Sequence, residues 1–275
     1  MPAMIVEDLW QSYRDKQARP PTLKLTLADA RRRRRRTDRW ALRGVSFTVE
    51  PGEMLSVIGH NGSGKSTLLR SLAGIYRPVR GKVTVRGRTA SLIDLTAGFH
   101  RLLTARQNVI LGGAIYGLPR TEVLERLDAV FEFAGLKGEE ETHLRAFSTG
   151  MAMRLGFSIA VAFDPDVLLV DEVLAVGDEA FKLKCLDKVR DLRNDGATVV
   201  FVSHELAIVR SLSDRVIVLD EGQILYEGEP DAAIEAYCAH LGVDVETALS
   251  RPLVQQQHLD ALDSRWGKRR SRRSV

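Results

Sequence analysis

Cysteine, aromatic residues and long hydrophobic runs are all scarce in this chain of 275 residues. Its two cysteines, Cys185 and Cys238, are too few for the disulfide framework of a small secreted domain, and both lie in helical patterns. We therefore expect two buried free thiols in a cytosolic setting. No apolar run approaches the roughly 18 residues that span a bilayer, and residues 1–10 carry acids in place of a basic flank. The sequence predicts neither a membrane-spanning helix nor a signal peptide.

Net charge is also small, at +4, but the positive charge is strongly clustered. Six consecutive arginines fill residues 31–36, and a basic stretch occupies residues 268–273. Such runs repel themselves and favour solvent or an anionic partner over a packed core. We interpret residues 15–38 as an inserted surface segment and residues 242–275 as a basic C-terminal tail. The remainder, with 44% hydrophobic residues overall, is large enough for a substantial core.

One stretch of the chain fits the phosphate-loop pattern G-x-x-x-x-G-K-[ST]. It consists of Gly59, His60, Asn61, Gly62, Ser63, Gly64, Lys65, Ser66 and Thr67. An apolar, strand-like run at 54–58 precedes the stretch, and a helical pattern at 68–73 follows it. Strand, glycine loop and helix is the setting that supports the motif. The sequence therefore predicts that this protein binds a nucleoside triphosphate.

The residue types of this loop match the chemistry of a triphosphate. Glycines let the backbone turn tightly and aim successive N–H groups at anionic oxygens. The helix that begins near Lys65 directs the positive end of its dipole at the same phosphates. Lys65 can reach the β- and γ-phosphates, and the Ser66 hydroxyl can bind Mg²⁺. We expect a nucleoside triphosphate and Mg²⁺ to bind here.

Further candidates follow two predicted strands that are apolar throughout, at 167–170 and 198–202. Asp171, at the end of the first strand, is the expected second ligand of Mg²⁺, and Glu172 could deprotonate the attacking water. His204 follows the second strand, where it can reach a γ-phosphate. Tyr13, after a strand at 4–10, could stack on the base. The alternatives are an acidic turn, a structural histidine and an aromatic residue that only packs.

Strand and helix patterns alternate along most of the chain. The predicted strands are at 4–10, 45–49, 54–58, 82–86, 89–95, 167–170, 198–202, 215–219 and 223–227. The predicted helices are at 68–73, 102–116, 120–134, 179–194, 231–241 and from residue 204 onward. A mostly helical stretch at about 100–163 interrupts the alternation, which indicates an inserted helical subdomain.

A further motif carries a resemblance to a known family. Residues 147–151, Phe-Ser-Thr-Gly-Met, lie between the helical stretch and the Asp171 strand, and they resemble the signature motif of ABC-type ATPases. With the phosphate loop, Asp171-Glu172 and His204 in that order, residues 1–241 resemble an ABC nucleotide-binding domain. The resemblance implies an α/β fold of the P-loop NTPase class. Its RecA-like core would carry an antiparallel β subdomain and an inserted α-helical subdomain.

The same resemblance assigns roles and a partner. It matches Tyr13 to the aromatic residue that stacks on adenine, and residues 175–178 to the loop after the catalytic glutamate. Ser148 and Gly150 would contact the nucleotide of a second copy, because a helix that begins there offers N–H groups, a hydroxyl and a positive dipole end. Two copies arranged head to tail would form a symmetric homodimer. ATP would join the two copies, and its hydrolysis would release them.

Departures from the common ABC pattern indicate a subgroup. The signature motif is not the commoner L-S-G-G-Q, and residues 170–178, at the end of the Asp171 strand, also depart from the commoner sequence. Leu95, beside Asp94, stands where a glutamine usually couples the site to a membrane partner. Gln107 lies too far along the chain to replace it. These features resemble the ATPase subunits that export O-antigen, capsule, teichoic acid or cell-wall galactan. The resemblance implies a separate permease subunit and a peripheral place on the cytoplasmic side of the inner membrane. The arginine-rich composition makes an actinobacterial galactan exporter one candidate.

Two other functions remain open at this point. The basic runs also suit a soluble ABC ATPase that acts on nucleic acid or ribosomes, although such proteins carry two cassettes or long coiled coils. A regulator that binds ATP without hydrolysing it would not need Glu172. Phe99, which follows Gly98, has two interpretations: an exposed contact for the permease, or a core residue packed on the helix at 102–116.

Overall fold

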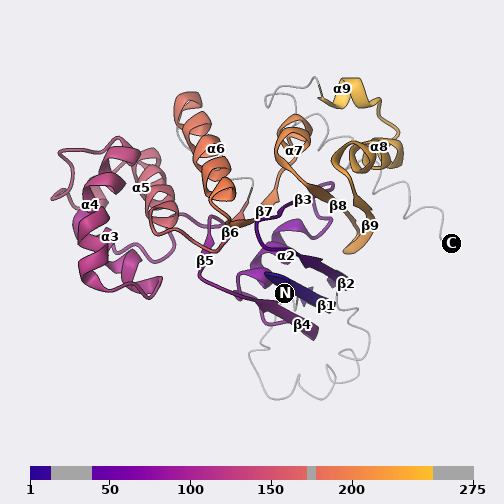
Figure 1. Ribbon diagram of the computed structural model, residues 1–275, viewed down its shortest axis with the longest axis horizontal. Helices are drawn as coiled ribbons and strands as arrows, with labels where there is room; N and C mark the ends of the chain where they lie inside the picture. The colour runs from indigo at the N-terminus through magenta and orange to yellow at the C-terminus, as the bar shows by residue number, and fades with distance from the viewer. Residues whose placement is uncertain (14–38, 172–177, 250–275) are drawn as a thin grey trace, which may run out of the picture.

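The computed structural model describes residues 1–13, 39–171 and 178–249. These residues form two sheets with helices around them (Figure 1). In the smaller sheet, β1 pairs antiparallel with both neighbours in the order β2-β1-β4. Its strands are β1 Met4–Tyr13, β2 Arg39–Val49 and β4 Arg80–Val85. This sheet is the antiparallel β subdomain that the family resemblance implies.

The larger sheet has six strands in the order β5-β6-β7-β3-β8-β9. All neighbours are parallel except β8 and β9, which form an antiparallel hairpin. The strands are β3 Met54–Ile58, β5 Thr89–Ser91, β6 Val167–Val170, β7 Thr198–Val202, β8 Arg215–Asp220 and β9 Gln223–Gly228. β6 and β7 are adjacent, as expected for the strands before Asp171 and His204.

Helices cover the larger sheet and form one separate group. They are α2 Lys65–Leu72, α3 Ala105–Ile115, α4 Arg120–Ala134, α5 Thr149–Ala162, α6 Glu179–Asn194, α7 Leu206–Leu212, α8 Pro230–Leu241 and α9 Val245–Leu249. A short 3₁₀ turn, η2 Leu144–Ala146, precedes α5. No helix of the described residues is long and apolar enough to cross a membrane.

The buried residues form three clusters, and the sheet strands contribute to two of them. Along β6, Leu168 packs into the cluster shared with α6, α7 and α8, whereas the next residue, Leu169, packs into the cluster shared with α2 and the small sheet. Both faces of this strand are therefore covered, which explains its uninterrupted apolar sequence. The third cluster lies within α3, α4 and α5. A core of their own is what defines these helices as a subdomain.

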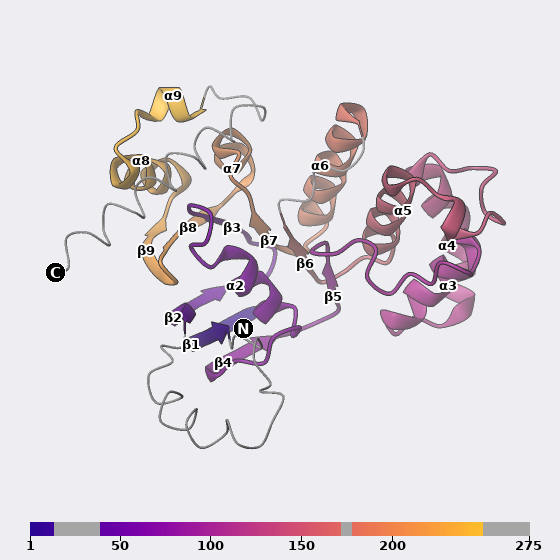
Figure 2. The same ribbon diagram turned by 180° about the vertical axis from the view of Figure 1, so that it is seen from behind.

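The two figures agree on the placement of this helical group. The helical group of α3, α4 and α5 lies at one end of the molecule. α2 lies near β1 and β2, and β6 lies between α2 and the helical group (Figures 1 and 2). α8 and α9 lie at the opposite end, close to α7. The connection between β5 and α3 leads from the sheet to the helical group.

Several element boundaries differ from the sequence-based expectations. β2 extends back to Arg39, because it pairs with the whole length of β1. β5 ends at Ser91 and not at residue 95, since the chain then turns, with Ala97 N–H donating to Asp94 O. α9 lies within residues 242–275, for which the sequence predicted only a basic tail. The prediction of two free, buried cysteines is confirmed.

Candidate functional site

The phosphate loop lies between β3 and α2, and its glycines adopt left-handed backbone angles. φ is 152° at Gly59, 86° at Gly62 and 114° at Gly64. A Cβ atom on Gly59 would overlap Leu219 O of β8, and one on Gly64 would lie 2.6 Å from Ala41 O of β2. A Cβ on Gly62 would meet nothing within 4 Å. Glycine is therefore required at the two positions where the loop contacts neighbouring strands, and Gly62 provides the turn.

The start of α2 has the properties of an anion site. Its N-cap, Gly64, makes no side-chain hydrogen bond, and its first turn contains no acidic residue. Ser63 Oγ is buried in the loop without a hydrogen-bond partner among the described residues. A helix N-terminus with this composition favours phosphate oxygens, which accept from backbone N–H groups and hydroxyls. The loop therefore fits the triphosphate of ATP.

Lys65 lies over this loop and is only 7% exposed. Its Nζ donates to Gly59 O at 2.6 Å and to His60 O at 3.0 Å. These contacts hold the ammonium group at the concave side of the loop, where β- and γ-phosphate oxygens are expected to bind. His60 and Asn61 form the tip of the loop, and Thr67 is buried in the first turn of α2.

Asp171 follows β6, two strands from the phosphate loop, and it is 8% exposed. Burial raises the pKa of its carboxyl above the ordinary value, and the cations Arg70 and Lys65 offset part of that rise. The positive charges of Lys65 and Arg70 thus act on this carboxyl. That Asp171 and Lys65 serve one nucleotide stays a prediction.

The oxygen atoms of the two predicted metal ligands suit Mg²⁺. Ser66 offers a hydroxyl and Asp171 a carboxylate, and Mg²⁺ typically takes one or two protein oxygens and completes its octahedron with phosphate oxygens and water. The described residues contain no group of three or more His, Cys, Asp or Glu side chains that could hold a metal ion. Mg²⁺ would therefore bind here together with the triphosphate.

His204 follows β7, the strand beside β6, and it is partly buried. An ion pair supports the next residue: Lys182 Nζ of α6 lies 3.0 Å from Glu205 Oε1, and the Lys182 side chain is only 8% exposed. Ser203 Oγ accepts from Glu205 N–H at 3.0 Å. The His204 turn is thus fixed to α6, the helix that starts just after residues 172–177.

The signature residues lie at the start of α5. Ser148 is the N-cap, exposed, and its Oγ accepts from Met151 N–H at 3.2 Å. Gly150 has room for a side chain, since a Cβ there would meet only Ser148 Oγ at 4.0 Å. α5 belongs to the helical group, which both views place apart from α2 (Figure 2). The structure therefore does not bring the signature residues together with the phosphate loop of the same chain.

Two predicted site residues cannot be placed. Glu172 lies outside the described residues, as do residues 173–177 of the following loop. Tyr13 ends β1 and pairs with Arg39, but its side chain is also outside what the structure describes. Asp178, the last residue of the matched loop, caps α6 by accepting from Phe181 N–H at 2.9 Å.

The structure explains why position 95 holds a leucine and not a glutamine. Leu95 is 8% exposed and packs in the main core, and its carbonyl touches α5 so closely that a Cβ on Gly156 would overlap it. Asp94 accepts from Thr96 N–H at 3.2 Å. Gln107 forms a capping box with Thr104 at the start of α3. Gln107 therefore stabilises that helix.

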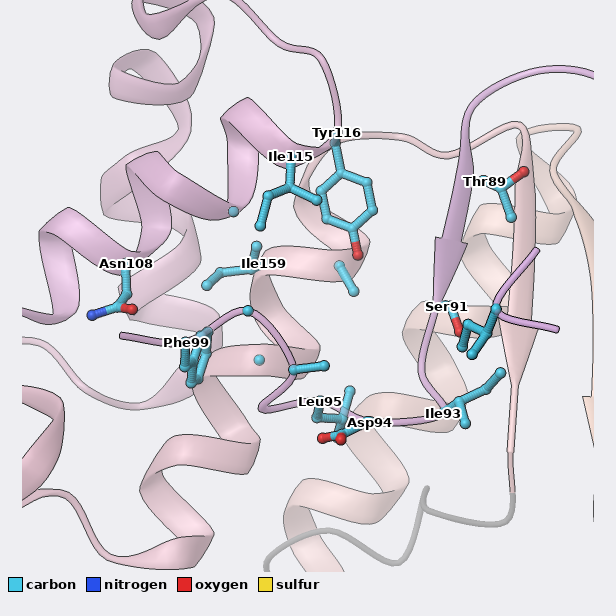
Figure 3. A pocket seen from close by; sticks show the side chains of 16 residues that line it. Thr89, Ser91, Ile93, Asp94, Leu95, Phe99, Asn108, Ile115, Tyr116 and Ile159 are labelled. Carbon is cyan, nitrogen blue, oxygen red and sulfur yellow. The ribbon is translucent and has the colours of Figure 1, made fainter. Parts of the chain in front are cut away.

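A hollow of about 250 Å³ lies between this segment and the helical group (Figure 3). Phe99 is half-buried there and packs against the helical cluster, so it is not the fully exposed aromatic residue that one interpretation required. Ile115, 63% exposed, projects from α3 at the rim. Its lining includes the side chains of Leu95, Phe99, Ile115, Tyr116 and Ile159.

The sequence analysis did not identify the residues that support the phosphate loop and the His204 turn through contacts from neighbouring elements. Gly222 N–H of the β8–β9 turn donates to Ser63 O at 2.8 Å, and Asp220, the last residue of β8, contacts His60. Lys182 was also missed. Asp220 and His60 are 160 residues apart, so no local pattern links them. The only sequence signal was the Asp-Glu-Gly hairpin turn, which says nothing about its neighbours.

Comparison with known proteins gives consistent results. The family described as ABC transporter matches residues 42–175. The O-antigen export system ATP-binding protein RfbB of Klebsiella pneumoniae is 43% identical over 197 residues, which are 72% of this chain and 80% of that protein. The ABC transporter protein AbcA of Aeromonas salmonicida is 41% identical over 72% of this chain and 64% of its own length. The teichoic acids export ATP-binding protein TagH of Lactiplantibacillus plantarum is also 41% identical, over 72% of this chain and 54% of its own. The chain thus spans less than two thirds of the latter two.

Solved structures share the fold. An ATP-binding subunit of an ABC transporter superposes with a TM-score of 0.71 at 22% identity, covering 90% of this chain and 97% of that one. A dimeric ATP-binding cassette with bound ADP and phosphate superposes with a TM-score of 0.66 at 22% identity, covering 82% of this chain and 98% of that one. At this identity the likeness establishes the α/β fold of the P-loop NTPase class.

Proposed function

This chain belongs to the ABC transporter family, and from that premise we propose that it is the ATP-hydrolysing subunit that powers export of a lipid-linked polysaccharide. The observation that carries the proposal is the extent of similarity to O-antigen and teichoic acid export ATP-binding proteins, about 40% identity over 72% of the chain. These relatives favour export over the alternative of a soluble ATPase that acts on nucleic acid or ribosomes.

In the proposed site, Lys65 and the loop N–H groups bind the triphosphate, while Ser66 and Asp171 hold Mg²⁺. The ion would neutralise charge that develops on the phosphate oxygens. Glu172 acts as the general base for the attacking water, and His204 donates to the γ-phosphate. Tyr13 stacks on the adenine. The Lys182–Glu205 ion pair holds the His204 turn against α6.

We propose that the site is completed by a second copy of this chain. The exposed start of α5, with Ser148 as N-cap, offers N–H groups and a positive dipole end but lies in the helical group, away from α2. A head-to-tail homodimer would place Ser148 and Gly150 of one copy over the nucleotide of the other. ATP would then hold the two copies together until it is hydrolysed.

The permease is proposed to contact the hollow beside Leu95. Its lining is mostly apolar, and Ile115 and Phe99 border it from two different elements (Figure 3). An apolar recess that is open at the surface suits a helix of another subunit. The chain would then sit peripherally on the cytoplasmic side of the inner membrane. The arginine run 31–36 and the basic residues 268–273, both outside the described residues, could contact anionic lipid there.

A complementation experiment tests this function. In cells that lack the chromosomal copy, Lys65→Ala should abolish export and leave the lipid-linked polysaccharide on the cytoplasmic side. Lys82→Ala is the matched control, because Lys82 is exposed on β4. It should restore export. Normal export with Lys65→Ala, or co-purification of the protein with ribosomes and not with a permease, would contradict the proposal.

A further inference from the structure

The ion pair between α6 and the His204 turn is shielded from solvent on both sides. Lys182 Nζ lies 3.0 Å from Glu205 Oε1 and 3.3 Å from Glu205 Oε2, so the ammonium group contacts both carboxylate oxygens. The side chains of Lys182 and Glu205 are 8% and 25% exposed. Water and salt therefore screen this pair less than they screen a pair at the surface.

Glu205 occupies a position at which other residue types are usually found. It is the N-cap of α7, where Ser, Thr, Asp and Asn are preferred because their side chains accept from the first N–H groups of the helix. The Glu205 side chain makes no such hydrogen bond. Its N–H donates to Ser203 Oγ at 3.0 Å, and its carboxylate contacts α6 instead. The contact with Lys182, and not helix capping, therefore explains the glutamate.

Lys182 is itself held firmly at the start of α6. Its N–H donates to Asp178 O at 3.0 Å, and the Asp178 carboxylate caps the helix by accepting from Phe181 N–H at 2.9 Å. Phe181, the residue before Lys182, is 7% exposed and packs in the main core. α6 and α7 lie on the same side of the larger sheet (Figures 1 and 2). Lys182 is therefore a fixed support for the turn before α7.

The packing around the His204 turn is incomplete where it faces α8 and α9. A hollow of about 90 Å³ lies there, and its lining includes His204, Glu205, Tyr237, Leu241 and Leu249. Atoms beside such a space lose part of the dispersion contacts that hold a densely packed segment. The turn thus has room to move on this side. A directional contact such as the Lys182 ion pair then has a larger part in deciding where the turn lies.

We infer that Lys182 is a positioning residue for ATP hydrolysis, which acts through Glu205 to hold His204 where it contacts the γ-phosphate. This inference rests on the proposed function and adds a residue to it. A catalytic group that is displaced by about 1 Å can lose up to about 10²-fold in rate. Loss of Lys182 should therefore lower the rate of hydrolysis. It should leave the affinity for ATP nearly intact, because Lys65 and the phosphate loop bind the triphosphate.

The test is single-turnover hydrolysis of ATP with Mg²⁺ by the full chain, with protein in excess so that slow rates are measurable. Lys182→Met keeps a long side chain without its charge and should lower the rate about tenfold. The dissociation constant of a non-hydrolysable ATP analogue should change by less than about twofold, because the lost interaction serves the reaction and not binding. Lys188→Met, further along α6, is the matched control and should change neither quantity.

Two further variants separate positioning from simple loss of structure. Lys182→Met alone leaves the Glu205 carboxylate without this partner, which costs stability. The paired variant Lys182→Met/Glu205→Gln removes both charges, so it should melt close to the unmodified protein and still hydrolyse ATP about tenfold more slowly. Lys182→Arg keeps a cation that pairs with a carboxylate, and it should regain most of the rate.

A double-mutant cycle with His204 gives the decisive comparison. If Lys182 acts through His204, Lys182→Met should cause no further loss of rate in a His204→Ala protein. The inference is overturned if Lys182→Met slows His204→Ala by the same factor as the unmodified protein, or if the folded paired variant hydrolyses ATP at the normal rate. An unchanged rate in His204→Ala would contradict the proposed role of His204, and the inference with it. Failure of the inference alone is thus distinguishable from failure of the proposed function.

Discussion

At the scale of single residues, Asp171 is a residue of the proposed site that lowers the stability of the fold. The carboxyl is 8% exposed, and burial raises its pKa more than the cations Arg70 and Lys65 lower it. A buried carboxyl with a raised pKa destabilises the fold when it is ionised. Residues that bind a ligand often cost stability in this way. Mg²⁺ with ATP would supply the compensating positive charge.

Asp171→Asn should therefore stabilise the nucleotide-free protein. Because the folded-state pKa is raised, the stability that Asp171 contributes is complete below its unfolded-state pKa and is lost as pH rises through the folded-state pKa. The asparagine variant should melt higher at pH 7 by a few degrees, with about 2–4 °C expected for each kcal/mol in a chain of this size. The gain should vanish near pH 3.5. Thermal melting of both proteins at the two pH values checks this, and an equal gain at both would contradict it.

The residues of the phosphate loop were predictable because their spacing is local. Gly59, Gly64 and Lys65 lie within seven consecutive positions, and the backbone angles of the glycines follow from that sequence. The contact of Asp220 with His60 was not predictable, since β8 must fold against the loop to bring the two residues together. A single sequence carries no signal for contacts between residues so far apart.

At the scale of elements, α5 and the chain after β5 are locked by close backbone contact. Gly156 lies within α5, and a Cβ there would overlap Leu95 O. The Leu95 side chain is buried in the main core. This contact fixes the start of the hollow that we propose for the permease. It also explains why a small residue stands in the middle of an otherwise apolar helix.

Gly156→Ala should separate these two elements. The added methyl group forces the Leu95 carbonyl away, and such overpacking usually costs about 1–3 kcal/mol of unfolding free energy. Gly150→Ala in the same helix is the control, because its Cβ has room and should leave stability unchanged or slightly raised. Urea unfolding of both variants measures the difference. Equal stability of the two would show that the contact is not tight.

Elements were predictable where burial is uniform or where caps are local. β6 and α6 have the predicted bounds, because four consecutive apolar residues form the strand and Asp178 caps the helix. The predicted strand at 89–95 was too long. Leu92 and Leu95 are buried as expected for a strand, but both lie beyond β5: Leu92 N–H still donates to Leu169 O of β6, whereas Leu95 lies in the turn that follows. Burial alone does not distinguish a strand from a tightly packed turn.

At the scale of the whole molecule, the hollow lies between the sheet and the helical group. Another subunit bound there could contact both parts and respond to a movement of one relative to the other. Phe99 lines it from the segment after β5, and Tyr116 and Ile159 line it from α3 and α5 (Figure 3). Phe99 is half-buried, so it contributes both to the fold and to the open surface. The interpretation as a core residue is thus met in part, and the contact of Phe99 with a permease stays a prediction.

Phe99→Ala should weaken the complex with the permease more than it weakens the fold. We expect at least a tenfold loss of permease affinity, with a loss of stability below the roughly 3–5 kcal/mol of a fully buried phenylalanine. Phe131→Ala is the matched control, because Phe131 is 1% exposed in the same helical cluster. Melting of the isolated subunit and pull-down with the permease measure the two effects. Equal destabilisation by both variants would assign Phe99 to the core.

In the proposed homodimer, one copy binds ATP through its phosphate loop while the partner copy closes the site with Ser148 and Gly150. The most direct test is the molar mass of Glu172→Gln in solution with saturating Mg²⁺ and ATP, measured by light scattering. Loss of the proposed general base should cut turnover by about 10²-fold or more and preserve the ATP-bound state.

Glu172→Gln should be a dimer with ATP and a monomer with ADP. Adding Gly150→Asp should keep ATP affinity and the fold, since a Cβ at Gly150 has room, but it should abolish the dimer because a carboxylate would face the partner's γ-phosphate. A dimer that forms equally well with Gly150→Asp, or a Glu172→Gln protein that stays monomeric in saturating ATP, would contradict the account.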